Sequence, residues 1–536
     1  MLFNSATFLF FFLPTVFGGF LLLAHFGLKR LAGLWLTLAS LAFYGWWNPQ
    51  YVPLLLGSMA FNYWVGGQLM RRRNSALLLS GIAANVALLG YFKYTGFAVQ
   101  TIVDVTGAGW AAPHIILPLA ISFFTFQQIA YLVDANDREV TEHGFLNYCL
   151  FITFFPHLIA GPITHHREML PQFSNPDRFR PRWDLVAVGV TLFFIGLFKK
   201  VLVADPFGTY ARPVFEQARS GGVQFIEAWS GALSYTLQIY FDFSGYTDMA
   251  IGLGLLFGIS LPPNFNSPFK ARNIIEFWNR WHMTLTRFLT AYIYNPIVVA
   301  MTRRRAAKGR PLPRRGKMSS ETFLVLVAFP TIFTMFISGV WHGAGWQFIV
   351  FGLLHGVYLV IAHAWRQWKV QRGIPLESSN PAKIAASVGL TFLCVMIALV
   401  FFRADNVPAA MNILSGMAGL NGITFPQRVA ELPLLGSLVA QLGLPVGDLQ
   451  AFTPSHAVRI FIFLVVVWSL PNSMQWLRSF PTALNLRPPA SWLERYSRLF
   501  RWRPSIPTGM ALGAASLVVM LYATSVAPTE FLYFQF

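Results

Sequence analysis

The chain has 536 residues, of which 55% are hydrophobic, 16% aromatic and only 11% charged, and its mean hydropathy is +0.52. Soluble domains carry about 25% charged residues, so this composition excludes an ordinary soluble globular protein. The formal net charge is +19, but the basic residues lie in short clusters between apolar runs. That pattern argues against nucleic-acid binding and is typical of a membrane protein with its positive loops in the cytoplasm.

Long apolar runs follow one another along the chain. Each approaches the roughly 20 apolar residues that a helix needs to cross a bilayer. The sequence therefore predicts an all-α, polytopic integral membrane protein with about eleven to thirteen transmembrane helices, plus re-entrant or interfacial helices. No internal repeat or low-complexity linker divides the chain, so a single membrane domain over residues 1–536 is predicted. The clearest runs are Thr7–Phe26, Leu31–Trp47, Leu77–Phe97, Leu185–Ala204, Thr322–Trp341, Trp346–Trp365, Ile384–Phe402, Val458–Leu470 and Thr508–Ala527.

Clusters of lysine and arginine between these runs orient the chain in the membrane. Because such clusters concentrate on the cytoplasmic side, Arg71–Arg73, Arg303–Lys317 and Arg478–Arg503 are predicted to be cytoplasmic. Counting back from the last of these clusters places residues 403–456 in a periplasmic loop region of the same domain.

The stretch Phe155–Phe173 is interrupted by prolines and a glycine, and we expect re-entrant backbone over Pro156–Trp183. His165 and His166 are adjacent and would point to different helix faces, and the other histidines show no ligand spacing, so no metal site is predicted. The chain also has no HExxH, Walker A or GxSxG pattern. These absences argue against zinc proteolysis, ATP-driven transport and serine hydrolysis.

Two carboxylates, Asp242 and Asp248, lie in an otherwise apolar stretch. Charged side chains at membrane depth usually pair with one another or line a cavity. Two interpretations are open: the aspartates cap and join two helices through Ser244 and Gly245, or they line a substrate channel.

The next polar stretch, EFWNRWHMTLTRFL, combines aromatic, basic and imidazole groups. On one continuous helix, Trp278 and Asn279 would lie four and three residues before His282, so the three side chains would share a face, and both residues are candidates for substrate binding. Arg280 and Arg287 lie off that face and are candidates for binding headgroups or an anionic donor. The alternative is an interfacial amphipathic helix with an aromatic belt, which explains His282 poorly.

In the stretch ISGVWHGAGWQFIVFGLLHG, histidines and glycines interrupt an apolar sequence. His342 is predicted to lie at the seam between two helices, where Gly343 and Gly345 permit backbone to approach a ligand closely. An imidazole with an ordinary pKa of about 6.5 is a natural proton acceptor at neutral pH. His355 lies inside the following helix and is either a hydrogen-bonded packing residue or part of the substrate site.

In this order, the polar stretches resemble those of the membrane-bound O-acyltransferase (MBOAT) family, and in particular its bacterial branch similar to alginate O-acetyltransferases. The resemblance covers essentially the whole chain. It rests on the motifs MLFNSATFLFFFLPTVF, YFKYTGF, LPLAISFFTFQQIAYLVD, AGPITHHREMLPQF, YFDFSGYTDMAIGLGLLFGI, FWNRWHMTLTRFL, SGVWHGAGWQFIVFGLLHG, FFRA and EFLYFQF.

The resemblance implies an acyltransferase that moves an acyl group, usually acetyl, from a cytoplasmic thioester donor to an extracytoplasmic acceptor through a central tunnel. Exopolysaccharide O-acetylation, as in alginate biosynthesis, is the expected process. The histidine of the family's W-H-G motif matches His342, the expected catalytic general base, with Trp341 and Gly343 beside it. The histidine of the family's W-x-x-W-H motif matches His282. Relatives often carry Arg where Asn279 stands, and the loop TRRRAAKGRPLPRRGKMSS is basic where theirs is Gly/Asn-rich.

No bound cofactor is expected, and the acyl donor is acetyl-CoA or an acyl carrier protein thioester. Expected partners are the lipid bilayer and a periplasmic SGNH-type acetyltransferase or another acceptor protein, and the expected location is a bacterial inner membrane. Two other functions are open: a transporter or channel for a polysaccharide or lipid intermediate, with the histidines as relay groups, and a lipid O-acyltransferase. Consumption of the acyl donor distinguishes the enzymes from the transporter.

Overall fold

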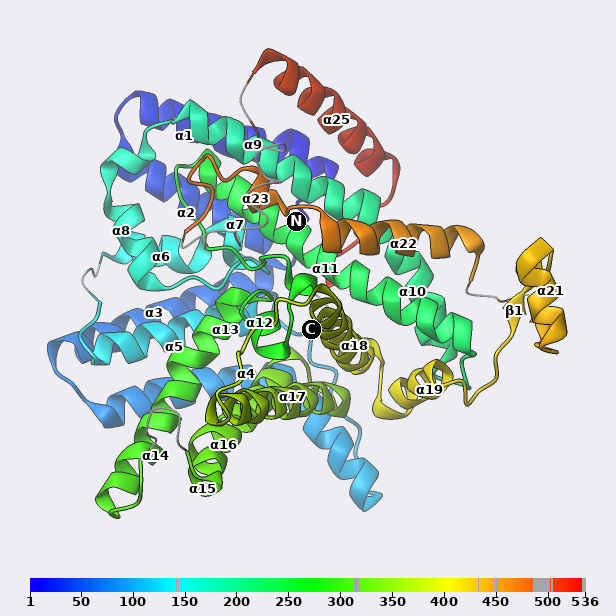
Figure 1. Cartoon of the computed structure of the whole chain (residues 1–536). Coiled ribbons are helices and arrows are strands. Elements are labelled where there is room, and N and C mark those ends of the chain that lie inside the picture. Colours follow the sequence, from blue (N-terminus) through cyan, green and yellow to red (C-terminus); the bar gives the residue numbers. More distant parts are fainter. Residues whose placement is uncertain are drawn as a thin grey trace. The chain divides into compact units, whose positions relative to one another are not determined.

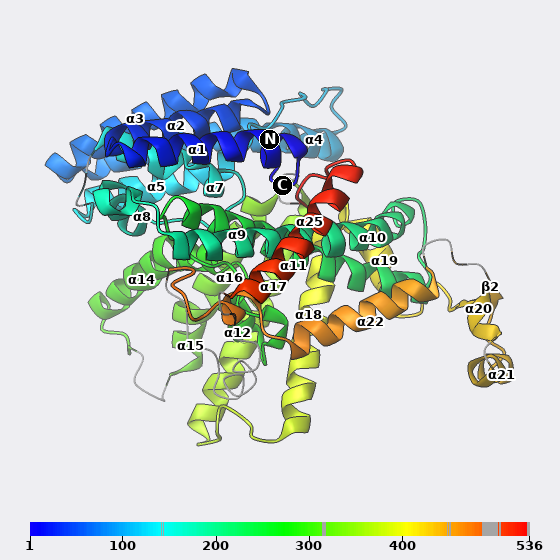
Figure 2. The same ribbon diagram turned by 90° about the horizontal axis from the view of Figure 1, so that it is seen from above.

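A computed structural model of the chain describes residues 1–140, 142, 144–312, 318–431, 433–447, 449, 452–484, 502 and 505–532. The regular structure in these ranges is helical except for one parallel pair of short strands, β1 (Phe425–Pro426) and β2 (Val446–Gly447) (Figures 1 and 2). The prediction of an all-α membrane protein is confirmed. Parts of the loops Arg303–Lys317 and Arg478–Arg503, parts of the 403–456 region, and the last four residues of EFLYFQF lie outside the described residues.

The chain divides into two compact units. Unit 1 comprises Met1–Leu202, Asp242–Asn264 and Asn472–Phe536, and unit 2 comprises Val203–Phe241 and Phe265–Pro471. The long helix α11 (Phe225–Leu256) contributes its first part to unit 2 and its second part to unit 1. The single domain over residues 1–536 stays a prediction.

Unit 1 is built mainly from the N-terminal helices. Helix α1 packs on α2, and α3, α4 and α5 lie side by side (Figure 2). Besides part of α11, the helices of this unit are η1 (Phe8–Phe12), α1 (Leu13–His25), α2 (Lys29–Gly45), η2 (Pro49–Tyr51), α3 (Val52–Arg71), α4 (Ser75–Thr106), α5 (Ile121–Asn136), α6 (Phe145–Thr153), α7 (Phe155–Leu158), α8 (His166–Ser174), η3 (Pro176–Phe179), α9 (Trp183–Phe198), the start of η4 (Lys199–Ala204), α23 (Ser473–Trp476) and α25 (Ile506–Ser525).

Unit 2 contains the long helices α16, α17 and α18, which follow one another in the chain and pack in sequence (Figure 1). Its helices are α10 (Asp205–Gln217), η5 (Pro268–Lys270), α12 (Ile274–Trp278), α13 (Met283–Leu289), η6 (Thr290–Tyr294), α14 (Asn295–Ala307), α15 (Ser320–Phe323), η7 (Leu324–Ala328), α16 (Phe329–His342), α17 (Trp346–Gln371), α18 (Pro381–Arg403), α19 (Val407–Met417), α20 (Gln427–Ala430), α21 (Pro433–Gln441) and α22 (Pro454–Ser469).

Seven helical segments among the described residues are long and apolar enough to cross a membrane, judged by length and composition. Each coincides with one of the clearest apolar runs of the sequence. The other two of those runs form α2 and α22, which are helical but have only 17 and 16 residues. The seven segments are Phe8–His25, Ser75–Thr106, Trp183–Gln217, Ser320–His342, Trp346–Gln371, Pro381–Arg403 and Ile506–Ser525.

The irregular backbone expected before α9 is present. Pro156–Trp183 contains only short helices, and most residues in its first part are buried. The ring of His157 is 2% exposed, and its Nε2 lies 3.1 Å from the carbonyl oxygen of Phe151. A buried polar contact of this kind satisfies backbone that the broken helices leave unpaired.

The interpretation in which two helices join at Ser244 and Gly245 is wrong, because α11 runs through both residues. Glycines there serve close packing between α9 and α11. A Cβ atom on Gly245 would lie 2.8 Å from the carbonyl oxygen of Gly196, and one on Gly252 would lie 2.5 Å from that of Gly189. Small residues allow helix backbones to approach this closely in membrane proteins.

The seam predicted between two helices at His342 is confirmed, since α16 ends at His342 and α17 begins at Trp346. Glycines again bring the two helices together. A Cβ atom on Gly339 would lie 2.4 Å from the carbonyl oxygen of Phe348, and one on Gly352 would lie 2.4 Å from that of Met335. This close crossing places the end of α16 against α17.

Candidate active site

The segment that carries Trp278, Asn279 and His282 is not one continuous helix. Helix α12 ends at Trp278, α13 begins at Met283, and His282 precedes α13 with φ 42° and ψ 51°. This left-handed conformation is uncommon for a residue with a side chain and costs about 1–2 kcal/mol. The predicted shared face is therefore wrong, because the turn leaves Asn279 exposed while His282 is 1% exposed.

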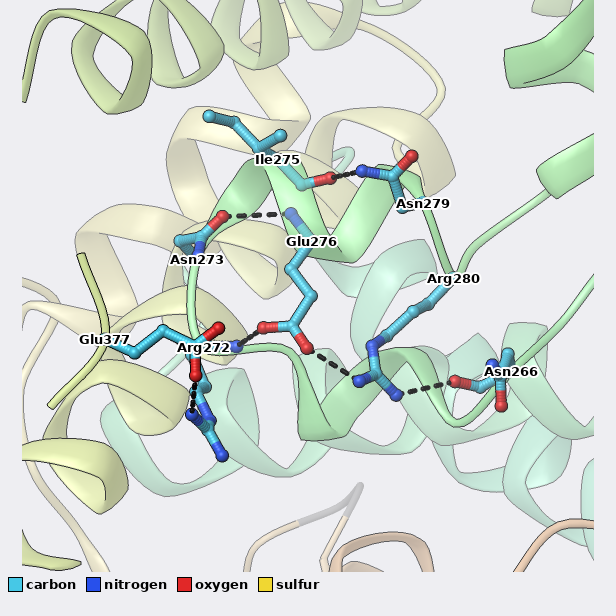
Figure 3. A network of polar contacts seen from close by, with 8 residues as sticks. All are labelled: Asn266, Arg272, Asn273, Ile275, Glu276, Asn279, Arg280 and Glu377. Carbon is cyan, nitrogen blue, oxygen red and sulfur yellow. Dashed lines mark hydrogen bonds and ion pairs between the residues drawn. The ribbon is translucent and has the colours of Figure 1, made fainter. Parts of the chain in front are cut away.

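A polar network holds this turn (Figure 3). The Glu276 carboxylate accepts hydrogen bonds from the Arg272 backbone N–H at 2.8 Å and from the Arg280 guanidinium at 2.6 Å. Arg280 also donates to the carbonyl oxygen of Asn266 at 3.1 Å, and Asn273 caps α12 by accepting from the Glu276 N–H at 2.9 Å. The network fixes the chain direction just before His282.

The described hydrogen bond of Asn279 is local. Asn279 Nδ2 donates to the carbonyl oxygen of Ile275 at 2.8 Å, within its own helix (Figure 3). Arg287 lies in the last turn of α13 and is half-buried. The substrate-binding roles of these three residues stay predictions, and the structure adds that Arg280 stabilises the turn.

The two histidines matched by the resemblance come together in unit 2. The ring centroids of His282 and His342 are 6.4 Å apart, and the ring of Trp341 lies 6.2 Å from that of His282. His342 is 5% exposed. Two imidazoles from elements far apart in sequence thus share one buried location.

Aromatic rings of α17 and α18 surround His342. The ring of Phe402 lies 5.0 Å away at 77°, and that of Phe351 lies 5.8 Å away at 87°. Neither phenylalanine is among the residues predicted for the site. The signal for Phe402 was present in the motif FFRA, whereas Phe351 is one apolar residue among many in α17.

His355 and Trp278 form a second contact close to this cluster. The Trp278 indole N–H donates to Nδ1 of His355 at 3.3 Å, so the proton of a neutral His355 is on Nε2. The Phe277 ring stacks on His355 at 6.2 Å and 3°, and the Phe351 ring lies 4.8 Å away. Phe351 therefore contacts both His342 and His355. Both interpretations of His355 remain open.

Gly343 packs against an aromatic ring of α17. Its backbone is extended (φ −166°, ψ 158°), and a Cβ atom there would lie 2.2 Å from Cε2 of Phe348. The predicted approach of a ligand to the Gly343 backbone stays a prediction. The glycine lets α16 end against an aromatic ring of α17.

Asp242 and Asp248 belong to unit 1, where each forms an ion pair. Lys200 Nζ lies 2.8 Å from Asp242, and Lys199 Nζ lies 2.6 Å from Asp248. Neither lysine is among the residues predicted from the sequence. No group of three or more His, Cys, Asp or Glu side chains within the described ranges is arranged to hold a metal ion. A role of the aspartates in substrate binding stays a prediction.

Burial lowers the pKa of His282 and that of His157 to about 3. Both imidazoles are therefore neutral near pH 7, whereas in the unfolded chain they protonate at a pKa of about 6.5. Because the unfolded state binds more protons between these values, the stability from each histidine is complete above pH 6.5 and is lost as the pH falls towards 3.

We therefore expect the midpoint temperature of thermal unfolding to decrease when the pH is lowered from 7 to 5. Each histidine should contribute about 2 kcal/mol of lost stability. The measurement is a melting series in detergent at constant ionic strength. The His157→Gln variant keeps a donor for the Phe151 carbonyl but has no titrating group there. Its midpoint temperature should therefore decrease less on acidification than that of the original chain. Equal losses in the variant and the original chain would contradict the assignment.

Comparisons with known proteins agree with the resemblance. The model of the membrane-bound O-acyltransferase family matches residues 135–310. The peptidoglycan O-acetyltransferase of Helicobacter pylori is 42% identical over 459 residues, which is 79% of this chain and 81% of the relative. The probable alginate O-acetylase AlgI of Pseudomonas aeruginosa is 33% identical over the full length of both chains.

A more distant similarity extends to a third kind of enzyme. The teichoic acid D-alanyltransferase of Bacillus subtilis is 29% identical over 297 residues, covering 54% of this chain and 70% of the relative. The match to the family model and the similarity to relatives over most of both chains show common ancestry. The chain belongs to the membrane-bound O-acyltransferase family and is a multi-pass membrane acyltransferase.

Proposed function

We propose that this enzyme transfers an acetyl group from a cytoplasmic thioester to a hydroxyl group of an extracytoplasmic polysaccharide. The similar proteins are named for peptidoglycan, alginate and teichoic acid, and those at 42% and 33% identity are named for acetyl transfer. These names support the proposed acetyl group and a polymer as the acceptor. They indicate no particular polymer, because the three names differ.

The observation that carries the proposed chemistry is the buried pair of His282 and His342, with ring centroids 6.4 Å apart. In our mechanism His342 accepts the proton of the acceptor hydroxyl while that oxygen attacks the thioester carbonyl carbon. The C–S bond then breaks, and the leaving thiolate takes the proton back from His342. A positioned general base contributes about 10²–10⁴-fold to the rate.

His282 is proposed to stabilise the oxyanion that forms during the attack. Its burial keeps the imidazole neutral, so one ring nitrogen carries a proton that can be donated. The left-handed backbone at His282 is the kind of strain that concentrates at functional sites. The turn network around Glu276 holds that strained position.

The donor's charged end is proposed to stay on the cytoplasmic side, near Arg287 or the basic Arg303–Lys317 loop. Coenzyme A and an acyl carrier protein both fit this proposal. Delivery to a polymer is proposed to need a periplasmic partner of the SGNH type, and the location is proposed to be the inner membrane.

A vesicle assay tests the function. The purified enzyme is reconstituted with donor, labelled in the acetyl group, on its cytoplasmic face and polysaccharide on the other face. Both acetyl-CoA and an acetyl-loaded carrier protein are tried, with and without the periplasmic partner. We expect free thiol on the donor side and label in the polymer on the other. A transporter would release no thiol, and a lipid acyltransferase would leave the label in the lipid extract.

A further inference from the structure

The motif EFLYFQF at the end of the sequence is not used by the proposed chemistry, yet its residues Phe531 and Leu532 are buried in unit 1. The carbonyl oxygen of Glu530 accepts a hydrogen bond from Lys200 Nζ at 3.0 Å. The backbone N–H of Leu532 donates to Oδ2 of Asp242 at 3.0 Å. The end of the chain therefore contacts both members of a buried ion pair.

This ion pair is deeply buried. The side chains of Lys200 and Asp242 are each 2% exposed, and Nζ lies 2.8 Å from Oδ1. Two charges removed from water are stable only when further hydrogen bonds satisfy their remaining donors and acceptors. One carboxylate oxygen is satisfied by Lys200 and the other by Leu532, so the C-terminal backbone completes the pair.

Phe531 strengthens the same contact. Its side chain is 0% exposed, and Lys200 Nζ lies 4.7 Å from the ring centroid, within the range of a cation–π interaction. The Phe531 ring also meets Tyr246 of α11 edge-on, at 4.8 Å and 82°. A desolvated lysine gains more from such a ring than an exposed one does.

The first residues of the chain meet the same tyrosine. The Phe3 ring stacks on Tyr246 at 5.0 Å and 20°, and Asn4 Nδ2 donates to the carbonyl oxygen of Thr529 at 3.3 Å. Residues from both ends of the sequence thus converge on α11.

A second ion pair holds another late part of the chain. Lys199 Nζ contacts Asp248 at 2.6 Å and donates to Ser473 Oγ at 3.2 Å. Adjacent lysines of η4 therefore hold the segment at α23 and the segment after α25.

We propose that residues 529–532 form a C-terminal clasp, which locks unit 1 by completing the buried Lys200–Asp242 pair. Without the clasp, Asp242 Oδ2 loses the hydrogen bond from the Leu532 N–H, Lys200 loses the one to the Glu530 carbonyl, and the Phe531 site is empty. Unit 1 then unfolds more easily. The clasp makes stability depend on residues 529–532, although they lie outside the proposed chemistry.

The test uses full-length enzyme purified in detergent and three variants: a chain ending at Ala527, Phe531→Ala and Glu530→Ala. The first two should lower the thermal midpoint by about 5 °C or more and speed proteolysis. Glu530→Ala is the matched control, because Glu530 is exposed and contributes its backbone carbonyl. It should leave the midpoint within about 2 °C. If the shortened chain does not accumulate, the comparison of the thermal midpoints of Phe531→Ala and Glu530→Ala tests the proposal.

A double-mutant cycle shows whether the clasp acts through the ion pair. Lys200→Met is combined with Phe531→Ala, and the two midpoint shifts are compared with the shift of the double variant. We expect the double variant to lose clearly less than the sum, since the partner of the clasp is already absent. Additive shifts would overturn the proposal, and so would a Phe531→Ala midpoint equal to that of Glu530→Ala.

Discussion

His342→Ala should lower acyl transfer at least about 100-fold, within the range of about 10²–10⁴ that a positioned general base supplies. The reason is local: His342 ends α16 and shares a buried location with His282 and Trp341. The expected loss is in kcat, because proton transfer occurs only in the transition state. Thiol release and acetyl transfer are both measured on enzyme of matched size-exclusion profile.

Other histidines supply the controls. His25→Ala, at an exposed position at the end of α1, should leave the rate unchanged. His355→Ala should keep measurable activity, because the described partner of His355 is Trp278. At position 282 asparagine tolerates the left-handed backbone better than alanine, so the effect of His282→Asn reports on the loss of the imidazole. Its loss of activity should lie between those of His342→Ala and His355→Ala. Near-normal turnover of His342→Ala would disprove the general-base mechanism.

Gly352→Ala is expected to destabilise the protein by about 3 kcal/mol, or to prevent folding, although it adds a single methyl group. The new Cβ atom would lie 2.4 Å from the carbonyl oxygen of Met335 and 3.0 Å from Gly339 Cα. Backbone atoms cannot turn aside as a flexible side chain can. Helices α16 and α17 must therefore separate, which also moves His342 at the end of α16. Thermal midpoint and acyl transfer should fall together.

Gly389→Ala is the matched control for this effect. Gly389 lies in the interior of α18, and no heavy atom lies within 4 Å of the position of a Cβ there. Alanine should leave stability unchanged or raise it by up to about 1 kcal/mol, because glycine is a weak helix former. Equal losses at Gly352 and Gly389 would show that helix propensity, and not the close crossing, governs Gly352.

Local sequence signals predicted the helices and the seam well. Each of the seven candidate spans corresponds to a run of apolar residues, and the end of α16 at His342 coincides with the glycines that follow it. The motifs also located His282 and His342. These features depend on hydropathy and backbone preference within a few residues, so a single sequence is sufficient to find them.

Only the tertiary structure decided what these residues contact. The turn between Trp278 and His282 contains no proline or glycine, and the Glu276 network holds it. Helix α11 continues through Gly245, where it packs closely on α9. The local sequence does not predict this packing.

The partners of the charged and aromatic groups were equally beyond the sequence. Hydropathy alone marks Asp242 as a carboxylate at depth, but Lys200 and the C-terminal residues that pair with it are far away along the chain. Phe402 and His342 are also far apart in the sequence, and only folding brings their rings together. The sequence by itself determined the membrane helices and the family, and its motifs selected His282 and His342, because those signals are local. Which groups meet was decided by folding, since through-space contacts between distant residues leave no periodic pattern in a single sequence.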